Sequence, residues 1–96
     1  SGFNVYPGEV ESVLCHFPGV QRAAVVGRAV SDGNEEILAF IETENHAPLD
    51  MAALNAYVAE NLAPYKRPAH IRWVQAFPMT LSGKVLKREL VASFHD

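Results

Sequence analysis

The sequence predicts a small α+β domain in which two main helices pack on an antiparallel or mixed sheet. Apolar residues recur at helical spacing in residues 7–17 and 50–62, which indicates two amphipathic helices. The apolar runs 20–27 and 37–42 are too short for typical helices, and residues 70–76 alternate like a half-buried strand. A chain of 96 residues forms one domain with one modest core, which its hydrophobic fraction of 49% can fill.

The two main helices carry recognisable start signals. Pro7 suits the first helical position, and Pro18 ends the first helix together with the glycine after it. Asp50 is a suitable N-cap for the second helix. Cys15 falls on the apolar side of the first helix, so we expect it to fill the core. As the single cysteine it excludes an internal disulfide and favours a reducing, cytoplasmic compartment.

The two apolar runs are expected to form neighbouring antiparallel strands. Residues 31–34 between them have strong turn chemistry, and the connection should be about eight to ten residues long, a little long for a hairpin. The helices are expected to pack on one face of this sheet. No apolar run approaches the ~20 residues of a membrane span. The four histidines match no metal-site spacing, so we expect no resident metal.

Residues 77–84 interrupt the pattern between the last strand and a short amphipathic helix over 85–91. Ser82 is a plausible N-cap of that helix, and Gly83 permits a tight turn. Lys84 therefore lies near a mobile junction between loop and helix, where a flexible ammonium suits an anion that arrives and leaves.

This stretch is not a phosphate-cradling P-loop. Such a motif needs a glycine five residues before the Gly-Lys pair and a hydroxyl residue after it, and those positions hold Pro78 and Val85. An ordinary solvated surface lysine stays open as the alternative interpretation of Lys84.

The charge distribution is uneven along the chain. The net charge is −3, but residues 66–96 carry six basic and two acidic side chains. This excess favours an anionic partner such as a phosphorylated cofactor, or it marks a solvated basic face. Nucleic acid is not expected, because no row of aromatic residues accompanies the basic ones.

Three stretches together resemble the C-terminal domain of the adenylate-forming, or AMP-binding, superfamily. They are residues 2–11 (GFNVYPGEVE), 62–68 (LAPYKRP) and 82–90 (SGKVLKREL). Their order and spacing cover nearly the whole chain, and their wording resembles fatty or aryl acid CoA ligases more than peptide synthetase domains. The chain departs from the family pattern at 30–34, and at Val91, where many members carry arginine.

The resemblance implies that residues 1–96 are the mobile lid of a two-domain acyl-CoA synthetase. In such ligases a carboxylic acid reacts with ATP to give an acyl-adenylate, and CoA then displaces AMP. The large N-terminal domain, which holds ATP, Mg²⁺ and the acid, would be this domain's partner and is absent from the sequence. We therefore expect the isolated domain to be inactive, and the family's hinge residue to precede Ser1.

The resemblance also implies site residues. Lys84 matches the family's invariant lysine, which would bridge the substrate carboxylate and the α-phosphate during adenylation. Gly2 and Phe3 match the loop that lines the pantetheine path in the thioester-forming pose. Two alternatives stay open: an adenylation domain that loads a carrier-protein phosphopantetheine, and a non-catalytic α+β interaction module.

Overall fold

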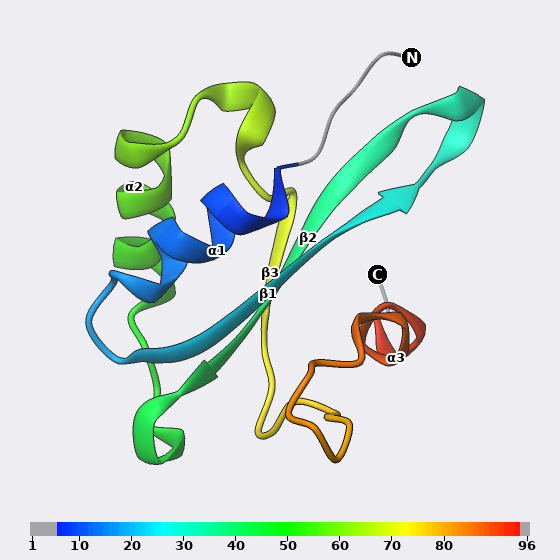
Figure 1. Cartoon of the computed structure of the whole chain (residues 1–96). Helices are drawn as coiled ribbons and strands as arrows, with labels where there is room; N and C mark the ends of the chain where they lie inside the picture. Colours follow the sequence, from blue (N-terminus) through cyan, green and yellow to red (C-terminus); the bar gives the residue numbers. More distant parts are fainter. Residues whose placement is uncertain (1–5, 95–96) are drawn as a thin grey trace.

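The structure, a computed structural model, describes residues 6–94, which form three helices and a three-stranded sheet. The elements follow in the order α1 (Pro7–Cys15), β1 (Val20–Ala29), β2 (Glu35–Thr43), α2 (Met51–Asn61), β3 (His70–Trp73) and α3 (Lys87–Ser93) (Figure 1). Short 3-10 turns occur at Ser31–Gly33, Glu44–His46 and Pro64–Lys66. The predicted α+β class is confirmed.

The sheet is mixed, with strand order β1-β2-β3. Strand β2 pairs antiparallel with β1 and parallel with β3. Strands β1 and β2 are both longer than predicted, so the expected connection of eight to ten residues shrinks to residues 30–34. Asp32 (φ 61°) and Gly33 (φ 73°) reverse the chain there. Strand β3 ends at Trp73, earlier than predicted, because the chain leaves β2 after the Val74 N–H donates to the Ile41 carbonyl at 2.9 Å.

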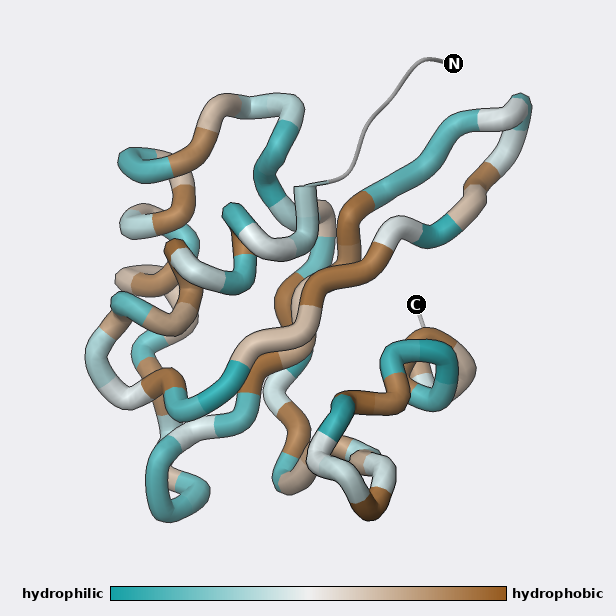
Figure 2. The backbone as a smooth tube through the Cα atoms, viewed as in Figure 1, coloured by the Kyte–Doolittle hydropathy of each residue, from teal (hydrophilic) through white to brown (hydrophobic). Residues whose placement is uncertain are grey.

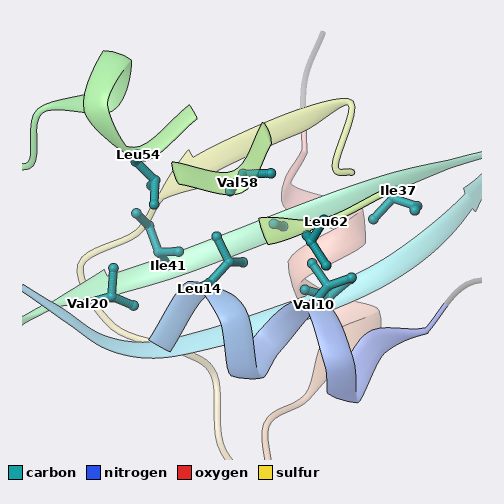
Figure 3. Packing of buried hydrophobic residues seen from close by; sticks show 10 residues of the cluster. Val10, Leu14, Val20, Ile37, Ile41, Leu54, Val58 and Leu62 are labelled. Carbon is teal, nitrogen blue, oxygen red and sulfur yellow. The ribbon is translucent and has the colours of Figure 1, made fainter. Parts of the chain in front are cut away.

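The two main helices cover the same face of the sheet, as predicted (Figure 1). Side chains of α1 and α2 meet alternate residues of the strands in one apolar cluster (Figure 3). Its buried members are Val10, Leu14, Val20, Val25, Ile37, Ala39, Ile41, Leu54, Val58 and Leu62. Asp50 caps α2 as predicted, since its carboxylate accepts the Ala53 N–H at 3.1 Å.

Helix α3 lies on the opposite face of the sheet, so the prediction that the helices share one face is wrong for this element (Figure 1). A second apolar cluster holds it there, with buried members Ala24, Val26, Leu38, Phe40, Phe77, Leu90 and Phe94. The reason lies in β2, which is buried on both faces and sends successive residues to opposite clusters. Figure 2 shows the resulting hydrophobic centre of the strands and the hydrophilic tip of the β1–β2 hairpin.

Cys15 is exposed, so its expected place in the core is wrong. It follows the buried Leu14 and faces the outer edge of β1 rather than the sheet. There the Ala23 N–H lies against the thiol, and four residues earlier the Glu11 carboxylate accepts the Val25 N–H at 2.8 Å. Helix α1 therefore supplies acceptors for N–H groups that an edge strand would otherwise leave unpaired.

Candidate functional site

Residues 78–86 fold into a closed loop, which we call the lysine loop. Its two sides pair, because Met79 and Val85 form an antiparallel bridge. Below that bridge the Leu86 N–H donates to the Pro78 carbonyl at 2.8 Å. Helix α3 starts at Lys87, so no residue separates the end of the loop from the helix.

The tip of the lysine loop turns at Gly83, whose φ of +90° favours glycine. The Gly83 N–H donates to the Thr80 carbonyl at 3.0 Å. The prediction that Ser82 caps α3 is wrong. Its hydroxyl lies 3.0 Å from the Thr80 hydroxyl, within the loop. The helix begins later than predicted, and its N-cap position is Leu86, which offers no side-chain acceptor.

Lys84 projects from this tip, and its side chain is exposed. Its backbone is fixed on both sides: the Lys84 N–H donates to Thr80 Oγ1 at 3.0 Å, and its carbonyl accepts the Thr80 N–H at 2.8 Å. Within residues 6–94, the Lys84 ammonium makes no hydrogen bond or ion pair. A lysine packed into the domain interior would contradict the predicted role; the observed side chain can reach outward.

The lysine loop is anchored to the sheet just before it begins. Phe77 is buried in the second cluster, and its N–H donates to Glu42 Oε2 at 2.9 Å. Arg22 lies 3.4 Å from the other Glu42 oxygen and also donates to Met79 Sδ at 3.4 Å. The base of the loop is thus held by buried apolar contact and by a carboxylate of β2.

Much of the basic excess in the last third is neutralised by acidic residues of α1. Lys66 pairs with Glu9 at 2.9 Å, and Lys87 pairs with Glu11 at 2.8 Å. Arg67 donates to the carbonyls of the last turn of α2. Two of the six basic side chains that favoured an anionic partner are thus paired with carboxylates, whereas Lys84 is exposed at the tip of a loop.

The ion pairs bring the three sequence motifs together. Lys66 of the second motif also lies over the rings of Tyr6 and Tyr65, at 4.9 and 5.5 Å from their centroids. Its hydrogen bond to Glu9 raises the pKa of the Lys66 ammonium, which keeps it charged. Lys87 of the third motif reaches the first motif on α1. Gly2 and Phe3, the predicted pantetheine residues, lie outside the described residues.

Two structural features are absent from the part of the chain that the structure describes. No group of three or more histidine, cysteine, aspartate or glutamate side chains could hold a metal ion there. No helix of that part is long and apolar enough to cross a membrane.

The sequence did not predict the roles of Thr80 and Glu42. Thr80 accepts the Lys84 N–H within the lysine loop, and Glu42 accepts the N–H of Phe77 just before the loop. A hydroxyl residue four positions before the lysine is the only sequence signal for Thr80. Glu42 gave no signal, because it reaches Phe77 across 35 positions.

Known proteins of similar sequence belong to the family that the three motifs resemble. Residues 9–84 match the family model described as the AMP-binding enzyme C-terminal domain. The chain is 43% identical over 89 residues to a 2-succinylbenzoate–CoA ligase of Geobacillus kaustophilus, covering 93% of this chain and 18% of the ligase. It is 37% identical over 90 residues to the fatty acid–[acyl-carrier-protein] ligase ScoC of Streptomyces coeruleorubidus, covering 94% of this chain and 17% of ScoC.

Solved structures agree. The ATP-bound crystal structure of MatB from Rhodopseudomonas palustris matches with a TM-score of 0.87 and 34% identity, covering 99% of this chain and 19% of MatB. The chain therefore spans about a fifth of the length of these relatives.

Proposed function

This chain belongs to the AMP-binding enzyme C-terminal domain family, and from that premise we propose that residues 1–96 are the lid domain of an AMP-forming acid–CoA ligase. Relatives of this domain include several CoA ligases of the adenylate-forming superfamily. The observation that carries the proposal is the exposed Lys84, held by its backbone at the tip of a closed loop. A larger N-terminal domain would bind the carboxylic acid, ATP and Mg²⁺.

The proposed reaction has two steps. A carboxylate oxygen attacks the α-phosphorus of ATP, pyrophosphate leaves, and an acyl-adenylate forms. The thiol of CoA then attacks the acyl carbon, AMP leaves, and a thioester forms. Mg²⁺ bound with ATP would offset the charge of the leaving pyrophosphate.

Lys84 would act in the first step. The attacking carboxylate and the α-phosphate are both anionic, so they repel each other until a cation lies between them. The Lys84 ammonium would align the two groups and stabilise the charge that builds as they react. Its long stem allows this reach, while the closed loop fixes where the stem begins.

The second step is proposed to use another part of the domain. Gly2 and Phe3 would line the path of the pantetheine arm, where a glycine lets the backbone approach the cofactor. The lysine loop would move aside when the domain turns to this second pose. The 96-residue chain alone is expected to catalyse neither step, because it lacks the larger domain; detectable pyrophosphate release by it would contradict this.

The test uses the full-length ligase that carries this domain. Lys84→Ala should slow pyrophosphate release from acid and ATP by about two to three decades, while thioester formation from supplied acyl-adenylate survives far better. Arg88→Ala removes another exposed cation four positions later and controls for net charge. Equal loss in both half-reactions, or equal loss in the control, would refute the role of Lys84.

A carrier-protein acceptor is the second candidate, because ScoC, which the chain also resembles, is a fatty acid–[acyl-carrier-protein] ligase. Both acceptors present the same pantetheine thiol, so the domain's chemistry would be unchanged. Comparing free CoA with a phosphopantetheinylated carrier protein as the acceptor decides between them. A clear preference of kcat/KM for the carrier would overturn the CoA assignment.

A further inference from the structure

Thr80 makes more hydrogen bonds to the tip of the lysine loop than any other residue in the described part of the chain. Its N–H donates to the Lys84 carbonyl at 2.8 Å, and its carbonyl accepts the Gly83 N–H at 3.0 Å. Its hydroxyl accepts the Lys84 N–H at 3.0 Å and lies 3.0 Å from the Ser82 hydroxyl. Every polar group of Thr80 is therefore committed within the loop.

We infer that Thr80 is a positioning residue for the adenylation step: it sets the base of the Lys84 side chain. This inference rests on the proposed function of Lys84. Both backbone polar groups of Lys84 bond to Thr80, so the direction of its Cα–Cβ bond is fixed by one partner. The torsions beyond Cβ remain free, which leaves the ammonium able to follow its anions.

The hydroxyl adds what the backbone alone cannot supply. The backbone groups of Thr80 bond to the Lys84 carbonyl and to the Gly83 N–H, so they leave the Lys84 N–H without an acceptor. Thr80 Oγ1 has two lone pairs and one proton, so it can accept the Lys84 N–H while it shares a hydrogen bond with the Ser82 hydroxyl.

Burial supports the same assignment. Thr80 is half-buried, whereas residues 81–84 are all exposed, and the Leu81 side chain is fully accessible to solvent. The hydroxyl that accepts the Lys84 N–H therefore belongs to the half-buried side of the loop and not to its exposed tip. The loop thus combines an anchored base with an exposed tip.

The test compares three variants of the full-length ligase in both half-reactions. Thr80→Val keeps the side-chain shape but removes the hydroxyl, and Thr80→Ser restores it. Thr43→Val is the matched control at the only other threonine in the sequence, because the buried Thr43 hydroxyl has no hydrogen-bond partner among the described residues. Urea unfolding of each variant checks that the fold is retained.

We expect Thr80→Val to lower kcat for pyrophosphate release about ten- to a hundredfold, because small misplacements of a catalytic group have effects of this size. The KM for ATP and the thioester step from supplied acyl-adenylate should stay near wild type. Thr80→Ser should recover most of the lost rate, and Thr43→Val should match wild type.

The outcomes separate this inference from the proposed function. If Lys84→Ala abolishes adenylation but Thr80→Val does not slow it, the role of Thr80 is wrong and that of Lys84 stands. Equal loss in both half-reactions for Thr80→Val, or no rescue by serine, would also overturn the positioning role. If Lys84→Ala leaves adenylation intact, the proposed function fails and this inference fails with it.

Discussion

Glu11 should contribute more to stability than its partly exposed position on α1 suggests. Its carboxylate accepts the Val25 N–H at 2.8 Å on the outer edge of β1 and pairs with Lys87 Nζ at 2.8 Å at the start of α3. It therefore joins a helix on one face of the sheet to the edge strand and to the helix on the other face. We predict that Glu11→Ala destabilises the domain substantially and that Glu11→Gln does so less.

The magnitudes follow from the two contacts. A hydrogen bond to a charged group contributes about 1.5–3 kcal/mol, and its loss leaves the Val25 N–H without an acceptor. The ion pair adds only about 0.2–1 kcal/mol, because the side chains of Lys87 and Glu11 are 40% and 25% exposed. Glu11→Ala should thus cost about 2–4 kcal/mol of the free energy of unfolding. Glutamine keeps a neutral acceptor for the Val25 N–H but loses the charge, so Glu11→Gln should cost about 1–2 kcal/mol.

Urea unfolding of the 96-residue chain, followed by circular dichroism, measures both values. Lys87→Met, which keeps most of the aliphatic stem, completes a double-mutant cycle for the ion pair and should cost little. A loss below about 0.5 kcal/mol for Glu11→Ala would refute the reasoning, since it lies within the usual scatter of surface substitutions. Equal losses for alanine and glutamine would assign the effect to the ion pair instead of the edge N–H.

Three further predictions concern single sites. Asp50→Ala removes the cap of α2 and should lower the free energy of unfolding by about 1 kcal/mol, whereas Asp50→Asn should be nearly neutral in the same urea assay. Gly19→Ala should cost at least about 1–3 kcal/mol, since φ is +95° and the new Cβ would lie 2.7 Å from Leu49 Cδ2; wild-type stability would contradict this. Desolvation raises the pKa of the Cys15 thiol, with a smaller contribution from Glu11, so its alkylation by iodoacetamide should need more alkaline pH than that of free cysteine. Because the folded-state pKa is the higher one, the free energy of unfolding should fall as pH rises above the pKa of the unfolded thiol. Alkylation of Cys15 at lower pH than free cysteine would refute the raised pKa.

Local signals predicted the parts of the fold that local physics decides. The spacing of apolar residues placed α1, α2 and the β1–β2 pair, and Asp50 caps its helix as the residue type suggested. The side of the sheet that α3 covers was beyond such signals, because it depends on where the chain goes after β3 and on which face of β2 remains uncovered. The prediction for Cys15 was wrong for a related reason: α1 ends at this residue, and its side chain is exposed while the preceding Leu14 is buried in the core.

The candidate site divides in the same way. Gly83 and Lys84 stand out in the sequence, and the turn at Gly83 is present. The residues that hold the loop are invisible in the sequence because their contacts depend on tertiary structure, as with Phe77 and Glu42. The charge of the last third could be counted, but its neutralisation by Glu9 and Glu11 could not, since those partners lie on a helix at the other end of the chain.

Strand β2 connects the two apolar clusters of this domain. Ile37, Ala39 and Ile41 pack in the cluster under α1 and α2, while Leu38 and Phe40 pack in the cluster under α3. Because both clusters pack against the same five-residue segment, α1 and α2 on one face and α3 on the other share one close-packed strand. In the proposed lid motion we therefore expect residues 6–94 to turn as one body, with the change in backbone angles lying outside β2.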